Sequence, residues 1–185
     1  MADVVTDLGE LPPVSCLPGE INQVFLNIIV NAAHAIDEVV AGTEQRGTIT
    51  VVTRTDGATA VIEISDTGAG IPDAIKSRIY DPFFTTKEVG KGTGLGLTVA
   101  YAIVEEHGGR MWLASEIGGG ASFFVELPCA GGKLKPLAPG EPGASSGAGD
   151  GFAGGRGVGA DAIEGVSDLM SSGGTGRPGL SVHAG

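Results

Sequence analysis

Two stretches of the chain repeat their apolar residues every three or four positions, which is the period of an amphipathic α-helix. The first covers residues 20–41, where Glu20 suits a first helical turn and Gly42 suits the C-terminal end. The second covers residues 94–107 and runs into Gly108-Gly109. The pattern therefore predicts two long helices, each with one apolar face.

Four other stretches alternate apolar and polar residues and are rich in β-branched or aromatic side chains, which is typical of β-strands. Asp56-Gly57 lies between the first two and Gly118 to Gly120 between the last two, so each pair is expected to form a hairpin. A short strand near Val4–Asp7 and a short helical stretch near 73–79 are also expected. The four main strands are expected at 48–55, 59–65, 110–115 and 121–127.

The elements follow one another in the order β-α-ββ-α-ββ, with neighbouring strands joined as hairpins. This order predicts an α+β fold in which the helices cover one face of a mainly antiparallel sheet. Residues 80–93 mix aromatic, proline, threonine, lysine and glycine residues and are expected to form a mobile loop.

Glycine divides the chain into two parts. The last 55 residues hold 17 of the 33 glycines and one aromatic residue, Phe152. Such a segment has too little apolar surface to offset the entropy of ordering it. We expect one folded domain over residues 1–130 and a flexible Gly-rich tail or linker over 131–185, with a helical turn or two at 161–170.

Charge and composition exclude several classes of protein. The chain has 22 Asp and Glu against 11 Lys and Arg, a net charge of −11, which disfavours nucleic acid as a main partner. Two cysteines cannot make a disulfide-dense scaffold or a four-cysteine metal site. No apolar run approaches the ~20 residues that cross a bilayer, and the first residues do not resemble a signal peptide. We expect no membrane segment in this chain and a cytoplasmic location.

A glycine run, Gly90-Lys91-Gly92-Thr93-Gly94-Leu95-Gly96-Leu97, opens the second predicted helix. Glycines let backbone N–H groups approach a phosphate, and a helix N-terminus offers unpaired donors. The run follows no strand and lacks the spacing of a Walker A motif, so neither common nucleotide fingerprint applies. Taken alone, the run is about as consistent with a flexible loop before a helix.

A second candidate is Asp66-x-Gly68-x-Gly70 at the end of a predicted strand. The carboxylate could accept a hydrogen bond from an exocyclic amine while the glycines leave room for a flat ring. A plain Asx turn is the commoner explanation of this motif by itself.

A third candidate is the helix edge formed by Asn27, Asn31 and His34, which lie at i, i+4 and i+7. Amide oxygens suit Mg²⁺, and the imidazole could meet a phosphate oxygen. Singly, such residues are more often capping or solvated polar groups.

The fourth candidate is Asp81-Pro82-Phe83-Phe84-Thr85-Thr86-Lys87. Its two aromatic residues indicate a lid that docks on apolar surface, with Lys87 bringing a positive charge towards a phosphate. The alternative is a loop whose Phe residues only anchor it to the core.

These motifs occur together and in a defined order: INQVFLNIIVNAAHAI, DTGAGIP, DPFFTTK, GKGTGLGLTVAYAIVEEHGG and GGGASFFVELP. In that order they resemble the N, G1, F, G2 and final Gly-rich boxes of the ATP-binding catalytic domain of sensor histidine kinases. The resemblance covers residues 1–128. It implies the Bergerat ATP-binding fold, a two-layer α/β sandwich shared with gyrase B, Hsp90 and MutL, with ATP between helices and a mobile lid.

The resemblance also implies roles for individual residues. Asn31 would bind Mg²⁺, and Asn27, Asn31 and Lys87 would act in phosphoryl transfer. Asp66 would recognise adenine. Ser122 would supply a hydroxyl near adenine, because Ala121 stands where the family often has threonine. The remaining nucleotide contacts implied are His34, Gly68, Gly70, Ile71, Phe84, Gly92, Thr93, Gly94, Leu95 and Gly96, with Phe83 also in the lid.

None of the three histidines, His34, His107 and His183, has the context of the family's phosphoacceptor. The resemblance therefore implies a partner: an acceptor-histidine domain in trans or in a missing part of a longer kinase, which in this family can be membrane-tethered, and then a response regulator. The N-terminal stretch resembles the segment directly after the acceptor helices of such kinases. Hydrolysing relatives carry Glu where Asn27 stands, so slow ATP hydrolysis is expected. A gyrase- or Hsp90-type ATPase, a serine kinase of the anti-sigma-factor type and a nucleotide-binding module without transfer activity are the alternatives.

Overall fold

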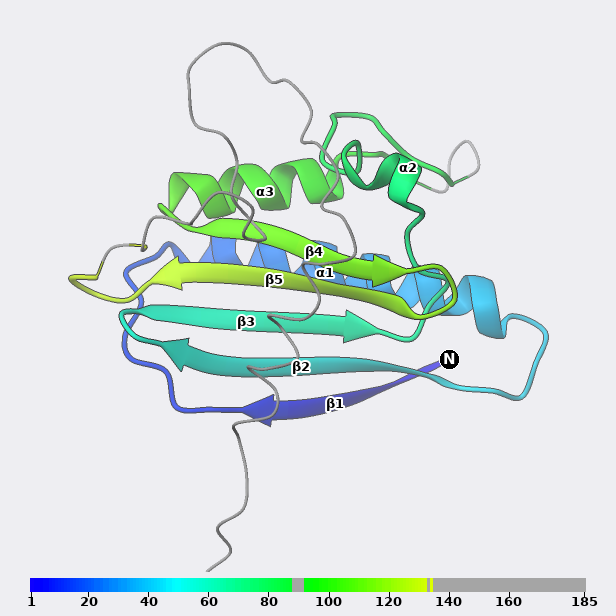
Figure 1. Cartoon of the computed structure of the whole chain (residues 1–185), viewed down its shortest axis with the longest axis horizontal. Helices are drawn as coiled ribbons and strands as arrows, with labels where there is room; N and C mark the ends of the chain where they lie inside the picture. Colours follow the sequence, from blue (N-terminus) through cyan, green and yellow to red (C-terminus); the bar gives the residue numbers. More distant parts are fainter. Residues whose placement is uncertain (88–91, 133, 135–185) are drawn as a thin grey trace, which may run out of the picture.

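The computed structural model describes residues 1–87, 92–132 and 134. The elements are β1 (Ala2–Leu8), α1 (Pro18–Val40), β2 (Gly47–Asp56), β3 (Thr59–Asp66), α2 (Asp73–Lys76), α3 (Gly96–Glu106), β4 (Arg110–Glu116) and β5 (Gly120–Pro128). One five-stranded sheet faces the viewer in Figure 1, with α1 behind it and α3 next to α1 along the β4 edge. This two-layer arrangement confirms the predicted α+β sandwich with helices on one face.

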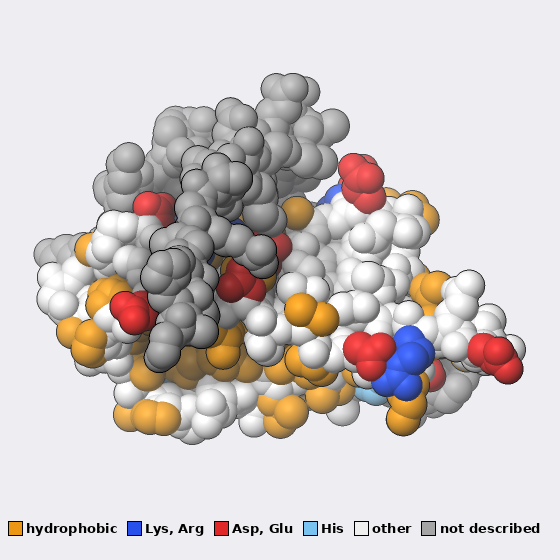
Figure 2. Space-filling model, turned by 90° about the horizontal axis from the view of Figure 1, so that it is seen from below, with side chains coloured by type: hydrophobic (Ala, Val, Ile, Leu, Met, Phe, Trp, Pro, Cys, Tyr) orange, Lys and Arg blue, Asp and Glu red, His pale blue; other side chains and the backbone are white. Residues whose placement is uncertain are grey.

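The strands are arranged in the order β1-β2-β3-β5-β4. β1 runs parallel to β2, and the other neighbouring pairs are antiparallel. β1 is an outer strand, and its side chains Val4, Val5 and Leu8 are exposed. Figure 2, seen from below the view of Figure 1, shows apolar side chains gathered on this side of the molecule. Its Asp3 forms an ion pair with Arg46, which precedes β2. The sheet is therefore mixed at one edge and antiparallel elsewhere.

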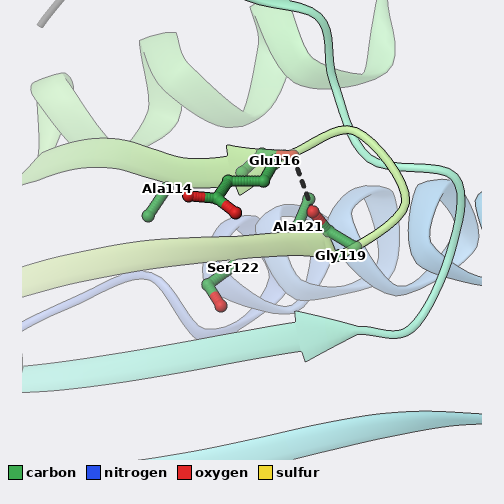
Figure 3. A pocket seen from close by; sticks show the side chains of 7 residues that line it. Ala114, Glu116, Gly119, Ala121 and Ser122 are labelled. Atoms are coloured by element: carbon green, nitrogen blue, oxygen red, sulfur yellow. Dashed lines mark hydrogen bonds between the residues drawn. The ribbon is translucent and has the colours of Figure 1, made fainter. Parts of the chain in front are cut away.

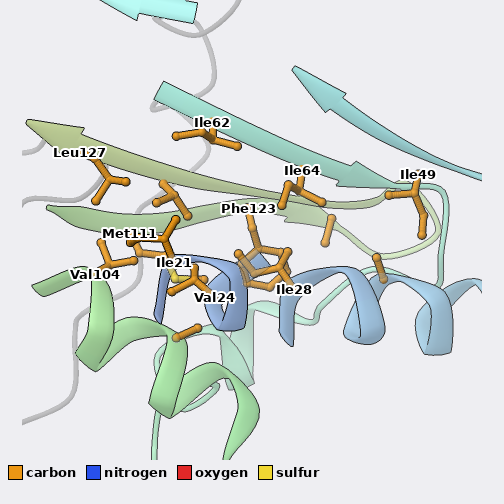
Figure 4. Packing of buried hydrophobic residues seen from close by; sticks show 14 of the residues in the cluster. Ile21, Val24, Ile28, Ile49, Ile62, Ile64, Val104, Met111, Phe123 and Leu127 are labelled. Atoms are coloured by element: carbon orange, nitrogen blue, oxygen red, sulfur yellow. The ribbon is translucent and has the colours of Figure 1, made fainter. Parts of the chain in front are cut away.

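The first predicted helix matches α1 closely. Pro18 stands in its first turn, where a missing N–H costs nothing, and Gly42 adopts a left-handed φ of 77° just beyond the C-cap residue Ala41. Its apolar stripe faces the sheet in Figure 4. The buried members of that stripe are Ile21, Val24, Ile28, Ala32, Ile36 and Val40.

The length and composition of α1 would also allow it to cross a membrane. Core helices pass the same test, and the stripe of α1 packs on Ile64, Phe123 and other sheet residues in one apolar cluster. In this structure α1 is therefore the central helix of the core.

The second long helix is shorter than predicted, because it starts at Gly96 instead of residue 94. Gly94 has a left-handed φ of 66°, and its carbonyl accepts the Phe83 N–H at 3.0 Å, so it cannot belong to the helix. The helical stretch expected near 73–79 is confined to α2. The turn expected at 161–170 lies outside the described residues.

Strand alternation gives the sheet two different faces. Ile62 and Ile64 point to the helices, while the intervening Glu63 faces away and pairs with Arg54 at 3.2 Å. On that outer face Trp112 stacks on Phe124 with ring centroids 5.2 Å apart. Only side chains on the inner face of the sheet can contact the helices.

The core position of Ile28 leads to a stability prediction. Ile28 is fully buried between α1 and the sheet, so Ile28→Ala should lower the free energy of unfolding by roughly 2–5 kcal/mol. Leu26 on the same helix is 55% exposed, and Leu26→Ala should change it by about 0.5 kcal/mol or less. Urea unfolding followed by circular dichroism measures both; equal losses would contradict the described packing of α1.

Candidate functional site

Asp66 ends β3 on the helix side of the sheet and is only 7% exposed. Its Oδ1 accepts the Gly68 N–H at 2.8 Å, and the Ala121 N–H also bonds the carboxyl group. Burial raises the pKa of Asp66, and these two hydrogen bonds oppose that rise. A carboxylate has about four acceptor positions, so two backbone donors leave capacity for a ligand amine.

The loop after Asp66 is held tightly between α1 and the end of β4. A Cβ on Gly68 would come within 2.6 Å of the Ala35 Cβ, and the Ala69 N–H reaches the Ala35 carbonyl at 3.3 Å. Gly70 has a φ of 76°, and a Cβ there would lie 1.9 Å from the Glu116 carbonyl oxygen. These two glycines are required by close approach, which explains their place in the motif. Ile71, next in the chain, packs against the core.

Asn27 connects α1 to the start of α3. Its Nδ2 donates to the Gly96 carbonyl at 2.9 Å, and its Oδ1 accepts from Gln23 at 3.0 Å. Asn31 lies one turn later on the same edge and is half-buried. This edge therefore brings amide groups beside the N-terminus of α3.

His34 lies one further turn along this edge, next to Lys87. The Lys87 Nζ is 2.7 Å from the His34 Nδ1, although 53 residues separate them. Burial lowers the pKa of Lys87, and the nearby Glu38 opposes that shift. The loop thus places the Lys87 ammonium group beside the α1 edge; its expected contact with a phosphate stays a prediction.

The two aromatic residues of the loop behave differently. Phe84 packs against the core and lies under the Arg78 guanidinium, 4.5 Å from the ring centroid. Phe83 is 74% exposed and takes a left-handed φ of 65°, unusual for a residue with a side chain. Phe84 anchors the loop, while Phe83 remains open to solvent.

The glycine run lies beside the loop that carries Phe84 and Lys87. A Cβ on Gly92 would lie 2.9 Å from the Thr85 Oγ1, so the run passes directly beside the loop. Thr93 accepts the Leu95 N–H at 3.4 Å, and both residues are exposed. Gly90 and Lys91 lie outside the described residues.

Ser122 is not brought to the other predicted residues. Its Oγ lies 2.7 Å from the Ser65 Oγ, on the sheet face away from the helices. The expectation that Ser122 supplies a hydroxyl near adenine is therefore wrong. Because strand side chains alternate, the neighbouring Ala121 faces Asp66 instead. Ser122 borders a hollow of about 220 Å³ at the β4–β5 turn (Figure 3), which Asp66 does not line.

Sequence reasoning missed Ser115 and Gln23. Ser115 bonds the backbone of the loop after Asp66, and Gln23 bonds Asn27. A signal for Ser115 was available, because it continues the inward positions Met111 and Leu113 of β4 with a polar residue. A hydroxyl at an inward strand position needs a partner.

The fold and this arrangement define an ATP-binding domain of the type found in histidine kinases, gyrase B and Hsp90. The model of the family described as "Histidine kinase-, DNA gyrase B-, and HSP90-like ATPase" matches residues 17–131, and the chain belongs to this family. Within the family, similarity to curated relatives and solved structures identifies the ATP-binding catalytic domain of sensor histidine kinases.

Curated relatives include the sensor kinase CckA of Brucella abortus, 40% identical over 134 residues. Sporulation kinase E of Bacillus subtilis is 38% identical over 122 residues, and the sensor histidine kinase ZraS of Escherichia coli is 41% identical over 118. These matches cover 64%, 65% and 64% of this chain. The chain spans only 13%, 15% and 23% of the length of those relatives.

Solved structures agree. The catalytic domain of the histidine kinase ThkA matches with a TM-score of 0.57 at 29% identity, over 69% of this chain and 80% of that one. Full-length ShkA, determined in complex with AMPPNP, matches with a TM-score of 0.58 at 26% identity, over 69% of this chain and 25% of that one.

The close approach at Gly70 leads to a prediction about the loop after Asp66. Gly70→Ala must both adopt a left-handed φ and displace the Glu116 carbonyl, so it should destabilise the protein by more than the roughly 1–2 kcal/mol of left-handed strain. Gly57 has a similar φ of 60° but open space around it, so Gly57→Ala isolates the strain alone. Thermal unfolding of both variants measures the difference in stability. Equal losses of stability would show that a Cβ at position 70 does not clash with the Glu116 carbonyl of β4.

Proposed function

We propose that this chain binds Mg²⁺–ATP and transfers the γ-phosphoryl group to a histidine on a separate acceptor domain. The supporting observation is that three segments meet one edge of α1: Gly96 at Asn27, Lys87 at His34, and Ala69 at Ala35. One edge of α1 thereby places the loop that carries Asp66, the proposed base-binding residue, near Lys87, His34 and the start of α3, which are suited to phosphates.

Base recognition would fall to Asp66. Its buried carboxylate accepts an exocyclic amine of adenine, while Gly68 and Gly70 leave the space above the loop free of side chains. Ile71 offers an apolar surface to the ring. A buried acceptor favours a base that carries a donor, because an unmatched partner leaves the carboxylate unsatisfied.

The phosphates would lie between the start of α3 and the α1 edge. Backbone N–H groups from Gly92 to Gly96 at a helix N-terminus favour anions, and Lys87 and His34 add donors. The lowered pKa of Lys87 reflects an ammonium group that burial has partly stripped of water. Phosphate charge would restore the stability of its protonated form.

Asn31 would bind the Mg²⁺ ion. Among residues 1–87, 92–132 and 134 no group of three or more His, Cys, Asp and Glu side chains could hold a metal. Mg²⁺ prefers oxygen ligands and keeps several waters when it bridges phosphates, and the Asn31 amide offers one such oxygen. When bound, Mg²⁺ neutralises charge on the phosphates as the transferred group leaves.

Transfer would form a bond from an imidazole nitrogen of the acceptor to the γ-phosphorus and break the bond to the bridging oxygen, releasing ADP. Water is a poor competitor, because Asn27 is an amide whose polar atoms already bond Gly96 and Gln23. It can neither take a proton from water nor turn freely towards one. This arrangement favours a kinase over a gyrase-type ATPase.

The proposal extends to partners and location. The acceptor histidine comes from another chain or from another part of a longer protein, and a response regulator then receives the phosphoryl group. Both steps would take place in the cytoplasm, where ATP is available.

A binding titration tests the proposed nucleotide site. Asp66→Ala should weaken binding of AMPPNP about 10- to 100-fold, because a hydrogen bond to a charged group contributes roughly 1.5–3 kcal/mol. Asp56→Ala, at an exposed turn, removes a carboxylate of the same type and should leave affinity unchanged. Asn31→Ala should abolish the gain in affinity that Mg²⁺ gives. Equal affinity of Asp66→Ala and the unmodified chain would refute the assignment of the base site.

A transfer assay tests the proposed activity. The chain is mixed with the isolated acceptor domain of a related sensor kinase and ATP labelled in the γ-phosphate. Labelled phosphohistidine should form on the acceptor, at a rate lowered at least tenfold in Lys87→Ala. Binding of ATP without any labelled acceptor would favour the module without transfer activity. Hydrolysis at about 10 per second would favour an ATPase.

A further inference from the structure

Ser115, near the end of β4, joins two segments that flank the proposed base site. Its Oγ accepts the Ile71 N–H at 2.8 Å and donates to the Gly120 carbonyl at 2.6 Å. Figure 3 shows the end of β4 and the turn into β5, where the second of these bonds is made. One hydroxyl therefore acts as donor and acceptor at once, which only Ser or Thr can do at this position with a compact side chain.

The two bonds of Ser115 reach two different segments that adjoin Asp66. Ile71 closes the loop that begins at Asp66, and Gly120 immediately precedes Ala121, whose N–H bonds the Asp66 carboxyl group. A displacement of Ser115 would therefore move both the loop after Asp66 and the backbone next to Ala121, and both segments contribute N–H groups that bond the Asp66 carboxylate.

The backbone around Ser115 has little room to adjust. A Cβ on Gly120 would come within 1.9 Å of the Asp66 carbonyl oxygen, and the Gly118 N–H donates to the Ala69 carbonyl at 2.8 Å. The β4–β5 turn and the loop after Asp66 thus lie in direct contact. The hydroxyl bonds across that contact and sets the separation of the two segments.

The main chain of Ser115 adds a third connection. Its carbonyl accepts a hydrogen bond from Lys76, which also pairs with Asp73 at 2.6 Å within α2. The segment after Ile71 is thereby held to β4 as well. Ser115 is therefore bonded to Ile71, Gly120 and Lys76.

We infer that Ser115 is a positioning residue for base recognition: its hydroxyl fixes Ile71 and Gly120 so that Asp66 meets the exocyclic amine of adenine. The inference rests on the proposed function. It assigns Ser115 no contact with the phosphates, so its removal should affect binding of the base and spare binding of the triphosphate.

The test compares variants of the full chain by titration with AMPPNP and GMPPNP in the presence of Mg²⁺. Ser115→Ala should weaken AMPPNP binding about 5- to 10-fold while GMPPNP binding changes less than twofold, so that discrimination between the bases falls. Ser115→Thr keeps the hydroxyl and should recover most of the discrimination. Ser65→Ala, a matched change on the outer sheet face, should behave like the unmodified chain.

Three outcomes would contradict the positioning role of Ser115. Unchanged AMPPNP affinity in Ser115→Ala overturns the inference, and so does a loss of the same factor for both nucleotides, which indicates a general structural role. Failure of Ser115→Thr to recover discrimination also overturns it. If Ser115→Ala does not fold, Ser115→Cys, whose thiol is a weak donor and acceptor, supplies the same ratio. Absence of AMPPNP binding by the unmodified chain would instead overturn the proposed function itself.

Discussion

The edge of α1 that carries Asn27, Asn31 and His34 fixes where the other parts of the site can lie. The Asn27 amide holds the first residue of α3, and the His34 imidazole meets Lys87 of the loop. The loop after Asp66 reaches the same helix at Ala35. Asn27 lies about two turns before His34 and Ala35, so the rise of the helix sets the spacing between the start of α3 and the other two segments.

The edge of α1 keeps its position because the apolar stripe on the other side of the helix is packed against the sheet. Ile28 and Ile36 are buried against the sheet, so the helix cannot rotate without exposing apolar surface. Asp66 enters the site from the same sheet, at the end of β3. The sheet thus orients both the helix edge and the carboxylate, and the core determines the geometry of the site.

Much of this arrangement follows from local patterns, and some of it does not. The Asp56-Gly57 hairpin and α1 were predictable because turn chemistry and apolar period are local properties. The orientation of Ser122 was not, because a Gly-rich turn leaves open which residue of β5 first faces the helices. The contact of Lys87 with His34 spans 53 residues and depends on how the loop folds back. For Ser115 the sequence offers a polar residue at an inward strand position, but it does not indicate the backbone groups that this hydroxyl bonds.

The central claim is that nucleotide binds on the helix side of the sheet, between Asp66 and the start of α3. Amide hydrogen exchange of the full chain, with and without Mg²⁺ and AMPPNP, tests it most directly. The account predicts slower exchange over 66–71 and 92–98, with a smaller change over the β4–β5 turn at 117–119, where Gly118 bonds Ala69 of the protected loop. Protection confined to that turn, or no protection over 66–71 while AMPPNP is bound, would contradict it.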